Sequence, residues 1–295
     1  MIKKKIVFLL VISLFLMGLP ISAQQKEGRK QRKEKIIENK EKAKTNRKFR
    51  KYKTKEQKFE AAKMYYDKGS YLNASQLFEE IYPLYLGTDR GDSILFLFAS
   101  SYFYNHDYLI AAFYFNDFMR KYPQSPRVEE AAFLKAKSYF LNSPNYNLDQ
   151  TDTYLAKENL ELFSNYYSQS SYISEVNTML DSLRNKLAKK DFAIASMYYR
   201  TENYKSAQIS FQNLVKDFAD SPYIEEALFI WVKNNYEFAI KSVEAKKVER
   251  FQMVIDVKNI LKAKYPSSPY LNEANKIAAD AEKRIQKLLT IVEKK

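Results

Sequence analysis

One short phrase occurs three times in this chain and constrains its fold more than any other feature. It reads KYPQSPRVEEA at 121–131, DFADSPYIEEA at 217–227 and KYPSSPYLNEA at 264–274. In each copy an apolar periodic run ends, Ser precedes Pro, and acidic residues follow. Ser is a favoured N-cap, Pro fits the first helical position, and acids there lie near the positive end of the helix dipole. The phrase therefore predicts helix starts at Ser125, Ser221 and Ser268. A weaker copy, NYYSQSSYISEV at 165–176, keeps Ser171 and lacks the Pro.

Small and aromatic residues recur at a fixed spacing between these joints. Ala62, Ala99 and Ala136 are 37 residues apart, and so are Tyr65, Tyr102 and Tyr139. A second set has Tyr, then Ala, then Phe four residues after the Ala, and it occurs as Tyr71, Ala74 and Phe78, as Tyr108, Ala111 and Phe115, and as Tyr204, Ala207 and Phe211. A fixed period with a small residue on each of two helices indicates closely packed helix pairs that stack on one another.

The repeat resembles the tetratricopeptide repeat, a helix-turn-helix of 34 residues, with Ala99, Tyr102, Ala111, Phe115 and Pro123 at its signature positions. The resemblance implies an all-α solenoid of about five helical hairpins. We place them at about 55–88, 92–125, 129–170, 188–221 and 222–266, with a capping helix at 269–292. A chain with only 5 Gly and 8 Pro agrees with a mostly helical fold.

Two departures from the period occur after residue 139. The third unit has an 8-residue insertion between its helices, within the stretch NSPNYNLDQTDTY, because Tyr139 and Ala156 are 17 residues apart where Tyr65 and Ala74 are 9 apart. Between Ala156 and Ala195 there are 14 more residues than between Ala74 and Ala99, which is close to four helical turns. We therefore expect one long helix over about 172–199. It would divide the N-terminal repeats, 56–170, from the C-terminal repeats and capping helix, 171–295.

The N-terminal region indicates export. Residues 1–23 combine three lysines, an apolar run and small residues ending at Ala23, as a cleaved signal peptide does. A membrane anchor, the alternative, needs about 20 apolar residues. Residues 24–55 then contain 15 Lys or Arg against 4 Asp or Glu, and we expect a disordered segment that is either an electrostatic tether to an anionic surface or a solvated tail.

The rest of the chain carries balanced charge, with 31 basic and 31 acidic residues over 56–295. A basic face for nucleic acid is therefore not expected. With no Cys and a single His, His106, the chain offers no disulfide and no multi-histidine metal site. It also lacks P-loop, G-x-S-x-G and H-E-x-x-H motifs. We predict a protein that binds and does not catalyse, with no cofactor and no metal.

The five repeats, the inserted SPNYNLDQTDTY, the stretch YLGTDRGDSILFLFASSYF and the joints resemble the BamD family of the bacterial outer-membrane β-barrel assembly machinery. The resemblance covers about 56–290. It implies a protein on the periplasmic face of the outer membrane. Its N-terminal repeats would receive the C-terminal segment of unfolded barrel precursors, and its C-terminal repeats would hold the barrel-forming subunit BamA.

One departure from that family concerns attachment to the membrane. Its members are normally lipoproteins with a Cys directly after the signal, whereas here Gln24 follows Ala23 and no Cys occurs. We therefore expect recruitment through the basic 24–55 segment or through protein partners. The alternative function is a periplasmic scaffold that coordinates cell-wall or secretion machinery.

Aromatic pairs seven residues apart are the candidate binding residues, because this spacing places both members on one helical face. In the first three repeats they are Phe59 and Tyr66, Phe96 and Phe103, and Phe133 and Phe140, and in the fourth repeat they are Phe192 and Tyr199. One interpretation is that they fill the core between helices. The other is an apolar ladder on the concave surface that accepts an extended precursor segment. Trp231 likewise is either a packing residue or an anchor for the partner subunit.

Overall fold

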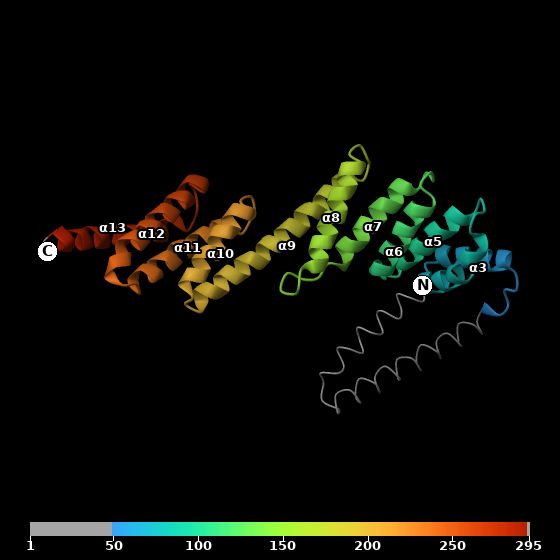
Figure 1. Ribbon diagram of the computed structural model, residues 1–295, viewed down its shortest axis with the longest axis horizontal. Coiled ribbons are helices and arrows are strands. Elements are labelled where there is room, and N and C mark those ends of the chain that lie inside the picture. The colour runs from blue at the N-terminus through green and yellow to red at the C-terminus, as the bar shows by residue number, and fades with distance from the viewer. Residues whose placement is uncertain (1–48, 294–295) are drawn as a thin grey trace, which may run out of the picture. The chain divides into compact units, whose positions relative to one another are not determined.

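A computed structural model describes residues 49–293 and is α-helical, with no strand among these residues (Figure 1). The predicted signal peptide and most of the basic segment lie outside the described residues. The helices are α3 (Lys55–Asp67), α4 (Tyr71–Ile81), the 3-10 helix η1 (Tyr82–Tyr85), α5 (Gly91–Tyr104), α6 (Tyr108–Lys121), α7 (Val128–Asn142), α8 (Thr151–Tyr166), α9 (Ile173–Arg200), α10 (Tyr204–Asp217), α11 (Ile224–Ile240), α12 (Glu244–Lys264) and α13 (Leu271–Glu293). The predicted all-α class is confirmed.

The chain forms two compact units, one ending at Ser101 and one beginning at Tyr102, and each is described by itself. In the first, α3 packs on α4. In the second, each helix from α6 onward packs on the next, and α11 also packs on α9 and on α13. These are the stacked hairpins and the capping helix that the repeat predicts. The division at 170/171 expected from the sequence lies inside the second unit and stays a prediction.

Helix α9 is the long helix expected after the third hairpin, with 28 residues. It contacts α7 and α8 as well as α10 and α11, so it belongs to the packing of both neighbouring hairpins (Figure 1). The insertion forms the loop between α7 and α8. Gln150, only 4% exposed, organises this loop by donating from its amide to the carbonyl oxygens of Asn145 at 2.8 Å and Leu148 at 3.0 Å. Both departures from the period are confirmed.

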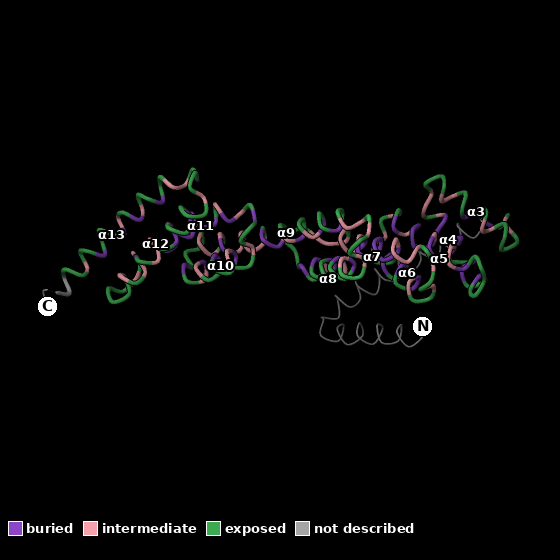
Figure 2. Tube along the Cα trace, turned by 90° about the horizontal axis from the view of Figure 1, so that it is seen from above, coloured by how far each residue is buried: buried purple, intermediate pink, exposed green. Residues whose placement is uncertain are grey.

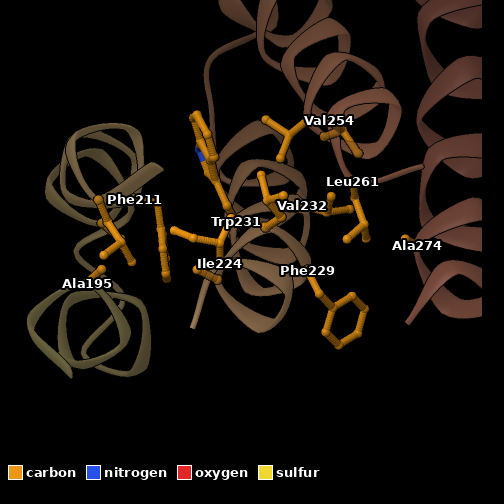
Figure 3. Packing of buried hydrophobic residues seen from close by; sticks show 14 of the residues in the cluster. Ala195, Phe211, Ile224, Phe229, Trp231, Val232, Val254, Leu261 and Ala274 are labelled. Atoms are coloured by element: carbon orange, nitrogen blue, oxygen red, sulfur yellow. The ribbon is translucent and has the colours of Figure 1, made fainter. Parts of the chain in front are cut away.

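The small residues of the repeat lie where helices cross. Ala62, Ala74, Ala99, Ala111, Ala136 and Ala207 are all buried, with at most 1% of their surface exposed. Around them, buried positions alternate with exposed ones along each helix (Figure 2). In the C-terminal half of the second unit, Phe211, Ile224, Val232, Val254 and Leu261 form one continuous core (Figure 3). Burying such side chains stabilises each hairpin only through its neighbours, as in other solenoids.

The prediction that Ser125, Ser221 and Ser268 are N-caps is wrong. The helices begin three residues later, at Val128, Ile224 and Leu271. Each serine closes a turn instead, because its carbonyl oxygen accepts from the N–H three residues ahead, at 3.1 to 3.2 Å. Its hydroxyl accepts from the N–H two residues ahead, at 3.2 to 3.4 Å. The acidic residues still fall in the first turn, as predicted.

The fourth joint follows the same rule one residue earlier than the sequence suggested. Ser170, and not Ser171, accepts from the N–H of Tyr172 at 3.1 Å. Ser171 therefore stands where the other joints have Pro. With this register the joints before α7, α9, α11 and α13 all read Ser, then any residue, then the residue that precedes the helix.

The last residues of the basic segment pack on the first unit. Phe49 is 2% exposed and its ring lies edge-on to Tyr65, with centroids 5.8 Å apart. Thr54 caps α3 by accepting from the N–H of Gln57 at 3.1 Å, and the Gln57 side chain accepts in return from the N–H of Thr54. This reciprocal capping box fixes the start of α3. Residues 49–54 therefore belong to the folded unit.

Candidate functional site: an aromatic groove on α9 and α11

The aromatic residues proposed for precursor binding differ in burial. Phe59 and Tyr66 are half-buried in the first unit, where Phe96 is 6% exposed. In the second unit Phe103 and Phe133 are buried and Phe140 is half-buried. The buried members fill the space between helices, and the half-buried members keep part of their rings accessible.

The half-buried rings of the first unit already have aromatic or cationic neighbours. Phe59 lies 6.3 Å from the ring of Tyr85, and the Arg90 guanidinium lies 5.7 Å from its centroid. Tyr66 meets the ring of Tyr71 edge-on at 5.5 Å. A guest at these rings would share them with Arg90 and Tyr71.

Trp231 lies in the core of the C-terminal hairpins. It is 9% exposed, and no described residue accepts a hydrogen bond from its indole N–H. Figure 3 shows Trp231 and Phe229 extending from opposite sides of α11, as two residues 200° apart on a helix must. This placement favours the packing interpretation of Trp231.

A large concave site lies on the other side of α11. It is a groove of about 600 Å³ in the second unit, lined by residues of α9 and α11, the joints before α11 and α13, and the inserted loop. These residues are Tyr146, Lys189, Phe192, Ala193, Ser196, Tyr199, Arg200, Tyr223, Glu226, Phe229, Ile230, Lys233 and Tyr270. Phe192 and Tyr199 are the pair that the heptad spacing of the fourth repeat predicts on the concave face. We call this site the aromatic groove.

Two stacked ring pairs form the wall of the aromatic groove. Phe192 on α9 stacks on Tyr223 with centroids 5.7 Å apart and planes 20° apart. Phe229 on α11 stacks on Tyr270 at 4.8 Å and 13°. Tyr223 immediately precedes α11 and Tyr270 immediately precedes α13, so each joint holds its ring against the helix two places earlier in the chain. Stacking therefore fixes the orientation of the rings that line the groove, so they lose little side-chain entropy when a guest binds.

Charged groups surround these rings. The Lys233 ammonium lies 5.2 Å from the Phe229 centroid and 3.6 Å from the Glu273 carboxylate. Lys189 lies 4.5 Å from the centroid of Tyr146 in the inserted loop. Burial raises the pKa of Tyr199 above its usual value, and the nearby Glu237 carboxylate raises it further, so this phenol keeps its proton. The surface thus combines apolar faces with fixed cations.

The arrangement is suited to binding a polypeptide. Aromatic and aliphatic faces offer apolar contact, and the charges at the rim select orientation. Within residues 49–293 no three His, Asp or Glu side chains converge as a metal site. No helix of that part of the chain is long and apolar enough to span a bilayer.

Sequence reasoning missed Tyr146, Tyr223, Tyr270 and Glu226 as members of the groove. A signal was present, because two of the three repeated joints read Ser-Pro-Tyr, and Glu follows that tyrosine by three residues in both. From the sequence alone, the joints predict helix starts and nothing more. Their tyrosines, Tyr223 and Tyr270, also stack on phenylalanines two helices earlier in the chain.

Comparison with protein families gives one match. The profile of YfiO, described as an outer membrane lipoprotein, matches residues 51–251, more than half of the chain. No curated protein matches the sequence. The matched range includes α3 to α11 and most of the aromatic groove, and it ends within α12.

Proposed function

The chain belongs to the YfiO family of outer membrane lipoproteins, and from this premise we propose that it is a non-catalytic adaptor of outer-membrane β-barrel assembly. YfiO is the family of BamD, a non-enzymatic type of outer-membrane assembly protein. The adaptor would bind unfolded barrel precursors and a BamA-like outer-membrane subunit at the same time, at the periplasmic face of the outer membrane.

The aromatic groove is the observation that carries this proposal. It lies on the C-terminal repeats, which hold the barrel-forming subunit in the family that the sequence resembles. Its rings are fixed by stacking, and its volume of about 600 Å³ suits a short run of side chains. We propose that a segment of the BamA-like subunit occupies it.

Precursors would bind to the N-terminal repeats. The accessible parts of Phe59 and Tyr66 in one unit and of Phe140 in the other are the proposed contacts, supported by the buried Phe96, Phe103 and Phe133 beneath. An extended, apolar precursor segment could place alternate side chains against such rings. Each unit is expected to bind by itself, and a guest that reaches both would gain from the higher effective concentration.

Attachment to the membrane is a separate part of the proposal. The sequence contains no Cys to carry a lipid, and we propose that residues 24–48, with 11 Lys or Arg against 4 Glu, associate with an anionic surface. Such an association is worth at most about 1 kcal/mol per basic residue near the surface. Protein partners would supply the remaining affinity.

Affinity purification from solubilised envelope tests the adaptor function. Wild-type protein should recover a β-barrel assembly subunit, and Phe192→Ala should lose it, because the ring lines the groove and is only half-buried. Tyr154→Ala is the matched control, since Tyr154 is 59% exposed on α8 and does not line the groove. Circular dichroism of both variants confirms that the helices remain. Recovery of cell-wall or secretion proteins in place of the assembly subunit would support the scaffold alternative.

A further inference from the structure

The second unit repeats one four-residue arrangement three times, which we call the stacked-pair motif. A Phe on one helix stacks on the Tyr that precedes the second helix after it, so the motif joins α7 to α9, α9 to α11 and α11 to α13. A second position lies four residues after the Phe, and a Glu lies three residues after the Tyr. The three copies are Phe133, Lys137, Tyr172 and Glu175; Phe192, Ser196, Tyr223 and Glu226; and Phe229, Lys233, Tyr270 and Glu273.

A lysine closes the first and third copies. The Lys137 ammonium lies 5.3 Å from the Phe133 centroid and 2.6 Å from the Glu175 carboxylate. Lys233 repeats this geometry, at 5.2 Å from the Phe229 centroid and 3.6 Å from the Glu273 carboxylate. In both copies one cation satisfies the ring face and the carboxylate together. The motif is therefore a receptor for an ammonium group that the chain itself supplies.

The middle copy has the same receptor without the cation. Ser196 stands where the other copies have lysine. Its hydroxyl oxygen is buried and has no hydrogen-bond partner among the described residues. Glu226 is exposed, and no described Lys or Arg forms an ion pair with it. Phe192, Tyr223, Ser196 and Glu226 all line the aromatic groove, so this receptor opens into it.

A serine four residues after a repeat phenylalanine does not by itself create such a receptor, as Ser100 shows. Ser100 lies four residues after Phe96, but the joint before α7 carries Arg127 where all three copies carry tyrosine. By sequence that repeat lacks the stacked-pair motif. The incomplete motif in the aromatic groove is thus distinguished by both its rings and its unpaired carboxylate.

We infer that the middle copy binds the side chain of a lysine or arginine from a polypeptide partner. The guest cation takes the place that Lys137 and Lys233 hold in the other copies, over the Phe192 ring and beside the Glu226 carboxylate, and it can donate to the Ser196 hydroxyl. Cation–π contact and a charge-assisted hydrogen bond are the recognising interactions. The inference rests on the proposed function only in taking the guest to be a polypeptide.

Charge around the receptor narrows the guest further. Lys189 and Arg200 lie on the same helix as Ser196, and Lys233 lies on α11, all lining the groove. These cations repel a guest with clustered basic residues, so the lysine-rich segment 24–48 of this chain is a poor occupant. The charge pattern fits one isolated lysine or arginine among apolar and neutral polar residues, on an extended segment of the partner.

Three peptide probes test the inference by fluorescence anisotropy. All are nine-residue, fluorescein-labelled peptides built on alternating Tyr and Gln. The first contains a single Lys, the second has norleucine in place of that Lys, and the third contains five lysines. The single-lysine probe should bind wild-type protein about tenfold more tightly than the norleucine probe, from the combined ion pair and cation–π contact. The five-lysine probe should bind no more tightly than the single-lysine probe. Equal binding of the lysine and norleucine probes would overturn the inference.

Ser196→Lys is the decisive variant because it fills the vacant position from within the chain. It should abolish the preference for the lysine probe while leaving the fold intact, since two other copies already carry lysine there. Glu226→Gln should reduce the same preference. Lys233→Ser should instead create a second lysine-binding position beside Glu273. A preference for lysine that survives both Ser196→Lys and Glu226→Gln would place the binding elsewhere and refute the assignment.

The two proposals fail in different ways. If wild-type protein recovers no assembly subunit from the envelope but prefers the lysine probe, the adaptor function is wrong and the receptor stands. If the subunit is recovered but the probes bind equally, the receptor is wrong and the adaptor function stands.

Discussion

The ring of Phe133 lies against the ring of Tyr172 with centroids 4.1 Å apart and planes 10° apart. Phe133 is on α7, and Tyr172 is the N-cap of α9. The same relationship joins α9 to the start of α11 and α11 to the start of α13. Stacked rings at the joints therefore set how closely alternate helices of the second unit approach one another, and the packing of the repeat and its binding surface depend on the same residues.

Replacing Phe133 by Ala should destabilise the second unit substantially. The ring is 4% exposed, and removing a buried Phe typically costs about 3–5 kcal/mol. Urea unfolding followed by circular dichroism measures the loss. Phe113→Ala is the matched control, because Phe113 on α6 is 65% exposed and should change stability by less than about 1 kcal/mol. Equal losses for the two variants would contradict the assigned burial.

Trp231 should tolerate phenylalanine but not alanine. Its indole N–H is buried without an acceptor among the described residues, so Trp231→Phe removes an unsatisfied donor while keeping most of the ring. We expect a change within about 1 kcal/mol, against about 3–5 kcal/mol for Trp231→Ala.

Unfolding is followed by tryptophan fluorescence in the wild type and by circular dichroism in the two Trp231 variants. Trp231 is the single tryptophan of the chain, so wild-type fluorescence reports unfolding of the C-terminal core directly, and circular dichroism follows the variants. A strongly destabilised Trp231→Phe, or loss of partner binding without loss of stability, would indicate that the indole has a role outside the core.

The helical hairpins could be predicted from the sequence because their signals are local and repeated. Alanines at a period of 37 residues fix the crossings, and the count of 14 extra residues fixes α9 to within a residue at each end. Both features depend on helical geometry alone. No tertiary information is needed to place them.

Helix starts and groove membership were harder to predict, for two physical reasons. A Ser-Pro pair suits a first helical turn and a turn before a helix equally well, and only the hydrogen bond from Tyr223 to Ser221 shows which occurs. A heptad spacing places Phe133 and Phe192 at equivalent positions, yet Phe133 is buried and Phe192 borders a groove. The helices packed around each ring determine whether it is buried or borders a groove, and the spacing of residues along one helix carries no information about those neighbours.

The Asp191 carboxylate should make stability depend on pH in an unusual direction. Burial raises its pKa above the ordinary 3.8, and the Asp217 carboxylate raises it further. An acid with a raised pKa in the folded state contributes its full stability below the unfolded value, and this contribution is lost as pH rises through the folded pKa. Asp191→Asn should therefore stabilise the protein at pH 7, with a benefit that shrinks toward pH 4.

Asp220 supplies the opposite sign as a control for Asp191. Its hydrogen bond with the Arg184 guanidinium, at 2.6 Å, lowers its pKa. A lowered pKa contributes stability above the unfolded value that is lost as pH falls through the folded one. Asp220→Asn should thus weaken the protein at pH 7 and matter less toward pH 4. Urea unfolding at pH 7 and at pH 4 measures the stability of both variants relative to the wild type. A change of the same sign in the two variants at pH 7 would refute the assigned environments.

Deleting the basic segment should separate membrane association from folding, provided that the deletion ends at the right residue. Removing 24–48 takes away 11 Lys or Arg and 4 Glu but keeps the buried Phe49 and the Thr54 cap. We expect unchanged thermal unfolding and weaker co-sedimentation with vesicles that contain anionic lipid, an effect that salt suppresses in the wild type.

Removing 24–55 should have the same effect on vesicles and an additional effect on folding. It deletes Phe49, which packs on Tyr65 at 5.8 Å, and the capping box at the start of α3. Loss of an N-cap alone costs about 1 kcal/mol, and loss of a buried Phe adds to it, so the first unit should melt at a lower temperature. If the 24–48 deletion still co-sediments with anionic vesicles as the wild type does, the tether hypothesis is wrong, and protein partners must recruit the chain to the membrane.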